Sequence, residues 1–223
     1  MWDEFNIKTW PAETIVYRDG VYCPDLSTLP DAPINTSHEL PVHIIYVGEI
    51  AGENTLNIDV TIDEQPVFLD VNVKNKKPAF LNIFIKNTGK NSEIRGHVLL
   101  ENNDNLTFDC RAIHSVENTC ILVQTNLLAG RNTKSKLSGA SVIEWGATEC
   151  TSDIAFSAMC DPSARVEFTP AQYISAEPKS AGHSAALYAP TVPQIQFLHE
   201  SGLGGAETAD VLRESFRNKF TLF

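Results

Sequence analysis

About ten short runs of β-prone residues follow one another from Val42 to Phe168, and no convincing helical pattern lies among them. The clearest run, Leu56 to Ile62, alternates apolar and polar side chains with a period of two, as in a half-buried strand. Asn, Asp, Gly, Ser and Thr, which favour turns, make up the breaks between runs. The pattern therefore predicts a mainly β chain. The expected strands are 42–47, 56–62, 67–73, 80–85, 94–100, 106–113, 119–127, 137–145, 153–158 and 165–168.

Two architectures fit this succession of strands. A β-sandwich or barrel is the usual product of many short strands separated by turns. A parallel β-helix, in which coils of three short strands stack on one another, has the same signature. The wide separation between Leu127 and Leu137 suits the corner of a coil better than a hairpin. Asn87-Thr88-Gly89 is the one weak hairpin signal. Periodicity alone leaves both architectures open.

Composition narrows the function. The chain of 223 residues has room for one large domain, and 43% hydrophobic residues are enough for a continuous core. A net charge of −11 argues against binding to nucleic acid or to an anionic membrane surface. No apolar run is long enough to span a bilayer, and the acidic segment Met1–Phe5 does not resemble a secretory signal.

The five cysteines are odd in number and include no Cys-x-x-Cys pair. Reduced thiols in a cytoplasmic protein fit this usage better than a disulfide framework.

The regions that flank the strands differ from them in residue composition and pattern. Residues 1–41 are rich in proline and suit an extended arm with a short strand at Thr14–Tyr17. Residues 42–185 form the β core, and residues 186–223 a helical segment. In the arm, burial of aromatic side chains would provide the anchors. The candidates are Trp2, Phe5, Trp10 and Tyr17.

The helical segment carries clear start and stop signals. Thr191 and Gln194 have the spacing of a capping box, and Gly202 favours the left-handed conformation that ends helices. A second helix is expected from about Ala206 to Phe220, with one apolar stripe along it. The stripe consists of Ala206, Ala209, Leu212, Phe216 and Phe220.

The order of these parts resembles the C-terminal end of the SufB/SufD family, the scaffold proteins of iron–sulfur cluster assembly. Val166-Glu167-Phe168 corresponds to the family's "LEI" strand, and Gly182–Ala185 to its His-Gly-Ala-Thr segment. Gln196–Leu203 and Glu207–Phe216 correspond to the two parts of "FYLxSRGLxxxEAxxLLxxxF". Upstream, Leu137–Ile143 is similar to the "FxGxIxV" strand. The chain departs from the family at Ala181, where a cysteine is common, and in lacking the Arg of Ser-Arg-Gly.

The resemblance extends from Leu137 to Phe220. It implies a right-handed parallel β-helix with a short C-terminal two-helix element. It also implies a short SufD-like subunit, a non-enzymatic scaffold or adaptor of the SUF system in the cytoplasm. The expected partners are a SufC-type ATPase, which docks on the C-terminal helices, and either a SufB-type scaffold or a second copy in a homodimer. No tightly bound cofactor is implied, and an iron–sulfur cluster would be transient.

His183 matches the histidine that the family places near the interface between paired scaffolds and the nascent cluster. A neutral imidazole can ligate iron, and its pKa suits proton transfer. The structural alternative is a histidine satisfied by a turn carbonyl in a Gly/Ser-rich loop. Cys150 and Cys160 are further candidate ligands, since thiolates usually hold iron–sulfur clusters. Their structural alternative is a small apolar side chain in a β core.

The C-terminal helices are the candidate partner site. Their apolar stripe either packs on the β core or presents an edge to the ATPase. Arg213 and Arg217 are the expected exposed neighbours of that edge. The full set of partner-binding candidates is Leu203, Leu212, Arg213, Phe216 and Arg217.

The alternative function is a polysaccharide-binding or polysaccharide-active β-helix, which would use clustered carboxylates. The sequence lacks a nucleophile elbow, a His-Glu-x-x-His motif and a phosphate-binding loop. An ATPase activity of this chain is therefore not expected. The carboxylates available for the alternative are Asp59, Asp63, Glu64, Asp70 and Glu144.

Overall fold

The structure is a computed structural model that describes residues 13–31, 34, 38 and 40–218. The first strands are β1 (Glu13–Arg18), β2 (Val21–Tyr22), β3 (Val42–Val60), β4 (Pro66–Asn87), β5 (Glu93–Asn102) and β6 (Asn105–His114). They continue as β7 (Cys120–Ala129), β8 (Lys134–Ile143), β9 (Thr151–Cys160), β10 (Arg165–Ile174) and β11 (Ser180–Tyr188). A short 3-10 helix η2 (Pro24–Leu26) follows β2, and the helices α1 (Val192–Glu200) and α2 (Gly205–Asn218) end the described chain.

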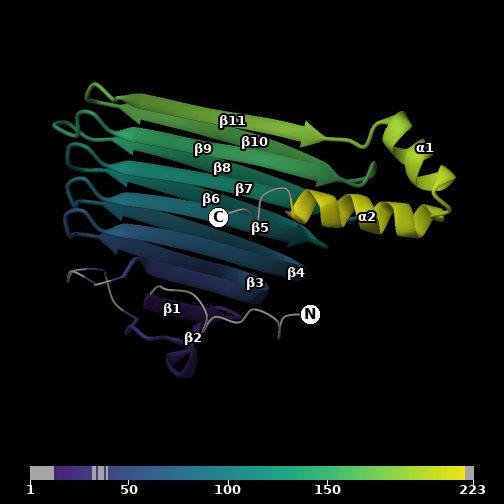
Figure 1. The fold of residues 1–223 in the computed structure, drawn as a ribbon, viewed down its shortest axis with the longest axis horizontal. Helices are drawn as coiled ribbons and strands as arrows, with labels where there is room; N and C mark the ends of the chain where they lie inside the picture. Colours follow the sequence, from purple (N-terminus) through teal and green to yellow (C-terminus); the bar gives the residue numbers. More distant parts are fainter. Residues whose placement is uncertain (1–12, 32–33, 35–37, 39, 219–223) are drawn as a thin grey trace.

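The strands stack as a parallel β-solenoid of about six coils (Figure 1). The long strand β4 crosses both faces of the solenoid, because Pro66–Asn75 pairs with β5 and Ala79–Asn87 pairs with β6. One face stacks β1, β3, β4, β5, β7, β9 and β11. The other stacks β3, β4, β6, β8 and β10. The parallel β-helix is thereby confirmed over the sandwich.

Each complete coil contains two strands, so the expectation of three strands per coil is wrong. The physical reason lies in strand length: the later strands run for nine or ten residues and form two broad faces joined by turns. The sequence pattern of strands and turns is the same in a two-strand coil and in a three-strand coil, so the sequence alone does not distinguish them.

The interior is a column of apolar side chains from successive coils. Val67, Ile94 and Ile121 are in register on neighbouring strands and are at most 1% exposed. Phe108 and Phe156 pack edge to face with ring centroids 6.4 Å apart. Each coil hides its inner face only against its neighbours, which explains why the period-two pattern repeats along the chain.

Polar side chains inside the corners satisfy the turn backbone. The Asn87 Oδ1 atom accepts hydrogen bonds from the Gly89 N–H at 3.1 Å and from the Ser92 hydroxyl at 2.7 Å. Gly89 has no room for a side chain, since a Cβ there would lie 2.0 Å from the Ile62 carbonyl oxygen. These contacts hold consecutive corners at a fixed distance.

The expected strands end at Phe168, but the Pro/Gly/Ser-rich residues that follow are also largely strand. β10 continues to Ile174, and β11 follows as a parallel partner of β9. The free edges of β8 and β9 offer backbone partners along their whole length, and this pairing outweighs the weak local propensity. Pro170 is compatible with β10 because none of the described strands lies beyond it, so the missing N–H costs no ladder hydrogen bond.

The short strand expected at Thr14–Tyr17 is confirmed as β1, which pairs in parallel with β3. The stack of coils thus begins inside the N-terminal arm. Tyr17 packs on Tyr46 with ring centroids 5.8 Å apart. The other proposed anchors, Trp2, Phe5 and Trp10, lie outside the described residues.

The two expected helices are present. The Thr191 hydroxyl accepts from the Gln194 N–H, while the Gln194 Oε1 atom accepts from the Thr191 N–H at 2.9 Å, which completes the predicted capping box. Gly202 has a φ of +89°, as expected for a helix stop. The expected end of the second helix at Phe220 lies outside the described residues. Among the described helices, none has the length and apolar character required to cross a membrane.

Candidate functional site

His183 lies on strand β11 rather than in a loop, so its structural alternative as a loop histidine is wrong. It is in register with Ile154 of β9, whose side chain points into the solenoid. His183 therefore occupies an inward-facing position of the last coil. It is nevertheless exposed, since the described chain places no further strand beside β11. The imidazole is accessible to a partner that approaches this end.

Cys150 is fully buried in the corner before β9. Its Sγ atom lies 3.1 Å from the Thr119 Oγ1 atom and donates to the Val116 carbonyl oxygen at 3.2 Å. The Thr119 hydroxyl also lies 2.7 Å from Nδ1 of the buried His114. These contacts give Cys150 a complete structural role in the corner.

Cys160 lies at the opposite end of β9 and is partly buried against the core. Burial raises the pKa of its thiol, which disfavours the thiolate that would bind iron. Burial also raises the pKa of Cys110 to about 12 and that of Cys120 to about 11. The protein environment thus keeps these three thiols protonated.

The structure does not bring His183, Cys150 and Cys160 together. The two cysteines bracket β9, a ten-residue strand, which separates them by roughly 30 Å at the usual rise per residue. In the part of the chain that the structure describes, no group of three His, Cys, Asp or Glu side chains has the arrangement of a metal site.

The predicted partner-binding residues of α2 divide into two groups. Phe216 is 4% exposed and packs on Leu99 and Leu128 of the outer face. Its ring also packs edge to face with that of Tyr188, with the ring centroids 5.6 Å apart. Arg217 is not the exposed rim charge that was expected. Its guanidinium contacts Glu101 at 2.9 Å and Glu214 at 2.8 Å. Phe216 and Arg217 therefore fasten α2 to the solenoid. Of the remaining candidates, Leu203 and Leu212 are partly buried and Arg213 is exposed.

Other apolar side chains of the helical segment face solvent. None of the α1 residues is buried, and Val192 and Phe197 are 76% and 68% exposed. Val211 of α2 is 40% exposed. These three exposed apolar residues are the candidate docking residues. Sequence periodicity missed them because the expected stripe was drawn through α2 alone, and Ala206 and Ala209 of that stripe are exposed.

The last coil, formed by β10 and β11, is a second candidate surface. In the described chain each strand pairs on one side only, so a row of backbone groups is open on the other. Leu187 is 65% exposed and Ile174 is 46% exposed, although both face inward. Trp145, in the turn after β8, is 88% exposed. An apolar open end of this kind is prone to pairing.

A polar chain across four coils, in which three of the four side chains are buried, was not predicted. The His43 Nε2 atom lies 2.6 Å from the Asp70 Oδ2 atom, and His97 links Asp70 to Asn126, whose Nδ2 atom lies 3.0 Å from His97 Nε2. Burial lowers the pKa of His97, and the nearby Asp70 opposes this shift. The available signal in the sequence was the spacing of Asp70 and His97, which are 27 residues apart and pair in register on neighbouring coils.

The carboxylates of the alternative function do not form a comparable group. Asp70 is occupied by His43, while Glu64 and Glu144 lie in separate turns. A scan against protein-family models found no match for this chain, and a search of the curated proteins found none either. The chain is therefore characterised by its fold, a parallel β-solenoid followed by two C-terminal helices.

Proposed function

We propose that this protein is a non-enzymatic scaffold or adaptor subunit of SUF-type iron–sulfur cluster assembly. The SufB/SufD-like segments support this, as does the order of parts, a parallel solenoid followed by a loosely attached helix pair. The five free cysteines are consistent with a cytoplasmic location. The observation that carries the proposal is the exposure of Val192, Phe197 and Val211 on one helix pair, since apolar surface that gathers in one region often marks a site of protein–protein contact.

In this proposal a SufC-type ATPase docks on α1 and α2. The exposed apolar residues supply the contact area, and Arg213 lies at the rim. Rim charges act on encounter and specificity more than on folding. Arg217 is excluded from this role, because its reversal would break the ion pairs that hold α2 in place.

The test measures binding of the full chain to a purified SufC-type ATPase by calorimetry. The double variant Val192→Ser, Phe197→Ser should weaken binding at least about tenfold, the equivalent of 1.4 kcal/mol, without changing the melting temperature. Trp145→Ser is the control, since it removes an even more exposed apolar side chain from a turn of the solenoid. Equal affinity of the double variant and the wild type would contradict docking on α1. Specific glycan binding without any ATPase contact would instead favour the polysaccharide-binding alternative.

The proposal also includes pairing through the last coil, with a SufB-type scaffold or with a second copy. The open edges of β10 and β11 provide the backbone groups for added strands. Light scattering of the isolated protein should report a dimer, and Ala185→Glu, which places a charge at an exposed inward-facing position, should convert it to a monomer. A wild-type monomer at high micromolar concentration would exclude the homodimer.

His183 would then contribute to the cluster at the paired ends. Because it is exposed, His183→Ala should leave the melting temperature unchanged and lower cluster loading in the reconstituted complex. The control is His199→Ala, which removes an exposed imidazole from α1. Equal loading of the two variants would assign no role to His183.

A further inference from the structure

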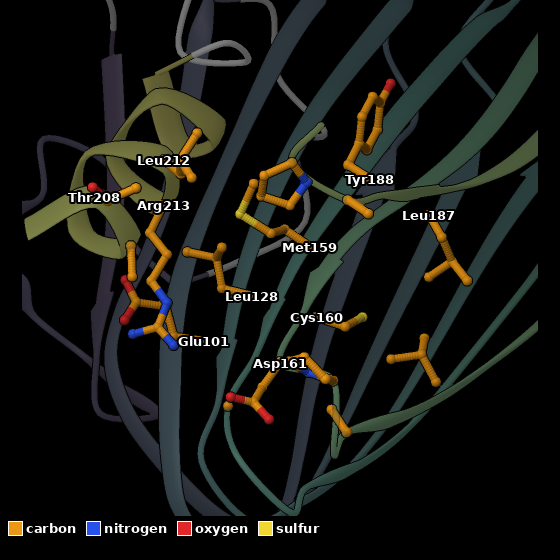
Figure 2. A pocket seen from close by; sticks show the side chains of 18 of the residues that line it. Glu101, Leu128, Met159, Cys160, Asp161, Leu187, Tyr188, Thr208, Leu212 and Arg213 are labelled. Atoms are coloured by element: carbon orange, nitrogen blue, oxygen red, sulfur yellow. The ribbon is translucent and has the colours of Figure 1, made fainter. Parts of the chain in front are cut away.

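A cavity of about 750 Å³ separates the helix pair from the end of the solenoid. Its walls come from the C-terminal ends of β7, β9 and β11, the start of β10, and the inner side of α1 and α2 (Figure 2). The volume lies in the range of small-molecule sites, which span roughly 300–1,000 Å³. We call this space the helix–solenoid cavity.

The body of the helix–solenoid cavity is apolar. Figure 2 shows Leu128, Met159 and Leu187 on the solenoid side and Leu212 on α2, around one open space. The side chains of the described residues leave it open, since α2 reaches the solenoid through Phe216 and Arg217 at its C-terminal end. The remaining apolar lining residues are Ala129, Ala164, Val166 and Ile195.

The charged lining residues differ in what they already bind. Arg217 is paired with Glu101 and Glu214. Asp161 accepts hydrogen bonds from Ser163 at 2.6 and 2.9 Å, and its pKa is lowered by those bonds, with smaller effects from Arg131 and Arg213.

Within the described chain, Arg213 has no hydrogen bond or ion pair within 4 Å. Its guanidinium is the lining cation that is available to a ligand. Glu101 and Asp161 on the same lining disfavour a multiply charged anion, so the site suits a single negative charge.

We propose that the helix–solenoid cavity binds a long-chain fatty acid, with the acyl chain against the apolar walls and the carboxylate at Arg213. Burial of the acyl chain removes apolar surface from water on both the fatty acid and the protein. The guanidinium supplies two parallel donors that match a carboxylate. This inference is independent of the proposed role in cluster assembly.

The test uses the full chain and the fluorescent fatty acid cis-parinarate, followed by displacement with palmitate. We expect saturable binding of one molecule per chain, with palmitate methyl ester displacing the probe at least about tenfold less well, because the ester lacks the charge. Arg213→Ala should weaken palmitate binding without weakening the methyl ester. Arg165→Ala, an exposed arginine on β10 outside the cavity, should bind as the wild type does.

Leu212→Trp fills the cavity and should abolish probe binding while the circular dichroism spectrum remains that of the wild type. If this variant does not fold, the comparison of acid and ester on Arg213→Ala decides the question. Absence of saturable binding by the wild type, or equal displacement by acid and ester, would overturn the proposal. Neither outcome depends on an ATPase, so failure here is separate from failure of the adaptor function.

Discussion

The solenoid and the C-terminal helices differ in the interactions that stabilise them. In the solenoid, strand pairing in register and interior packing act together, and side chains such as Leu81, Ile83 and Phe108 are completely buried. In the helical segment, α1 buries no residue and α2 is fastened mainly by Phe216 and Arg217. The closely packed solenoid thus supports a helical segment whose exposed apolar residues remain available for other contacts.

The largest expected effect comes from Phe156 in the solenoid. Phe156 is 1% exposed and lies between Phe108 and Phe168, with ring centroids 6.4 and 6.0 Å away. Phe156→Ala should lower the free energy of unfolding by about 3–5 kcal/mol, as for other buried Phe to Ala changes. Chemical denaturation measures this. A loss below about 1 kcal/mol would show that the interior is not closely packed.

Acid should weaken the solenoid more than the helices. Burial lowers the pKa of His114 from 6.5 to about 4, so the folded state favours the neutral imidazole. Stability from this group is fully present above pH 6.5 and is lost as the pH falls toward 4, by a total of about 3 kcal/mol.

The measurement is the free energy of unfolding as a function of pH. His114→Asn should flatten the profile between pH 6.5 and 4, since Asn87 occupies the corresponding position one coil earlier. His97, whose pKa burial also lowers, accounts for part of the slope that remains. An unchanged profile in His114→Asn would exclude His114 as a source of acid sensitivity.

A smaller effect is expected where the two regions meet. Phe216→Ala should cost about 2 kcal/mol, at the low end for buried side chains, since the helix can detach without unfolding the coils. Hydrogen exchange should accelerate in α2 and remain slow in β5 and β7. Phe197→Ala is the control and should change stability by less than about 0.5 kcal/mol, because this side chain is 68% exposed. Equal losses of unfolding free energy in the two variants would show that Phe216 does not attach α2 to the solenoid more strongly than Phe197 does.

The smallest effect is a gain in the solenoid corners. Glu149 has a φ of +56°, in the left-handed region, where Asn91 and Asn118 stand in earlier corners at 58° and 57°. Glu149→Asn should raise the free energy of unfolding by about 0.5 kcal/mol, because Asn tolerates this conformation better. Glu144→Asn removes the same charge from a turn residue without a positive φ and should give no gain. If the two variants have equal melting temperatures, the loss of a negative charge explains any change, and the conformation at Glu149 does not.

Local patterns in the sequence predicted the strands, the turns between them and the capping box at Thr191. They failed at β11, where Ser180–Tyr188 has little intrinsic preference for a strand and is held by the free edge of β9. They also missed the 27-residue spacing that places Asp70 beside His97, because adjacency of coils depends on a repeat length and not on neighbouring residues.

The sequence by itself determined that the chain is mainly β with two helices at its end, because alternation, turn residues and capping signals act over a few positions. The tertiary structure alone decided which residues meet. It separated Cys150 from Cys160 and left His183 accessible on the last coil. It also buried Phe216 and exposed Phe197, although both are aromatic residues on helices. These outcomes depend on the stacking of one coil on the next and on which coil is last, and a local pattern contains neither.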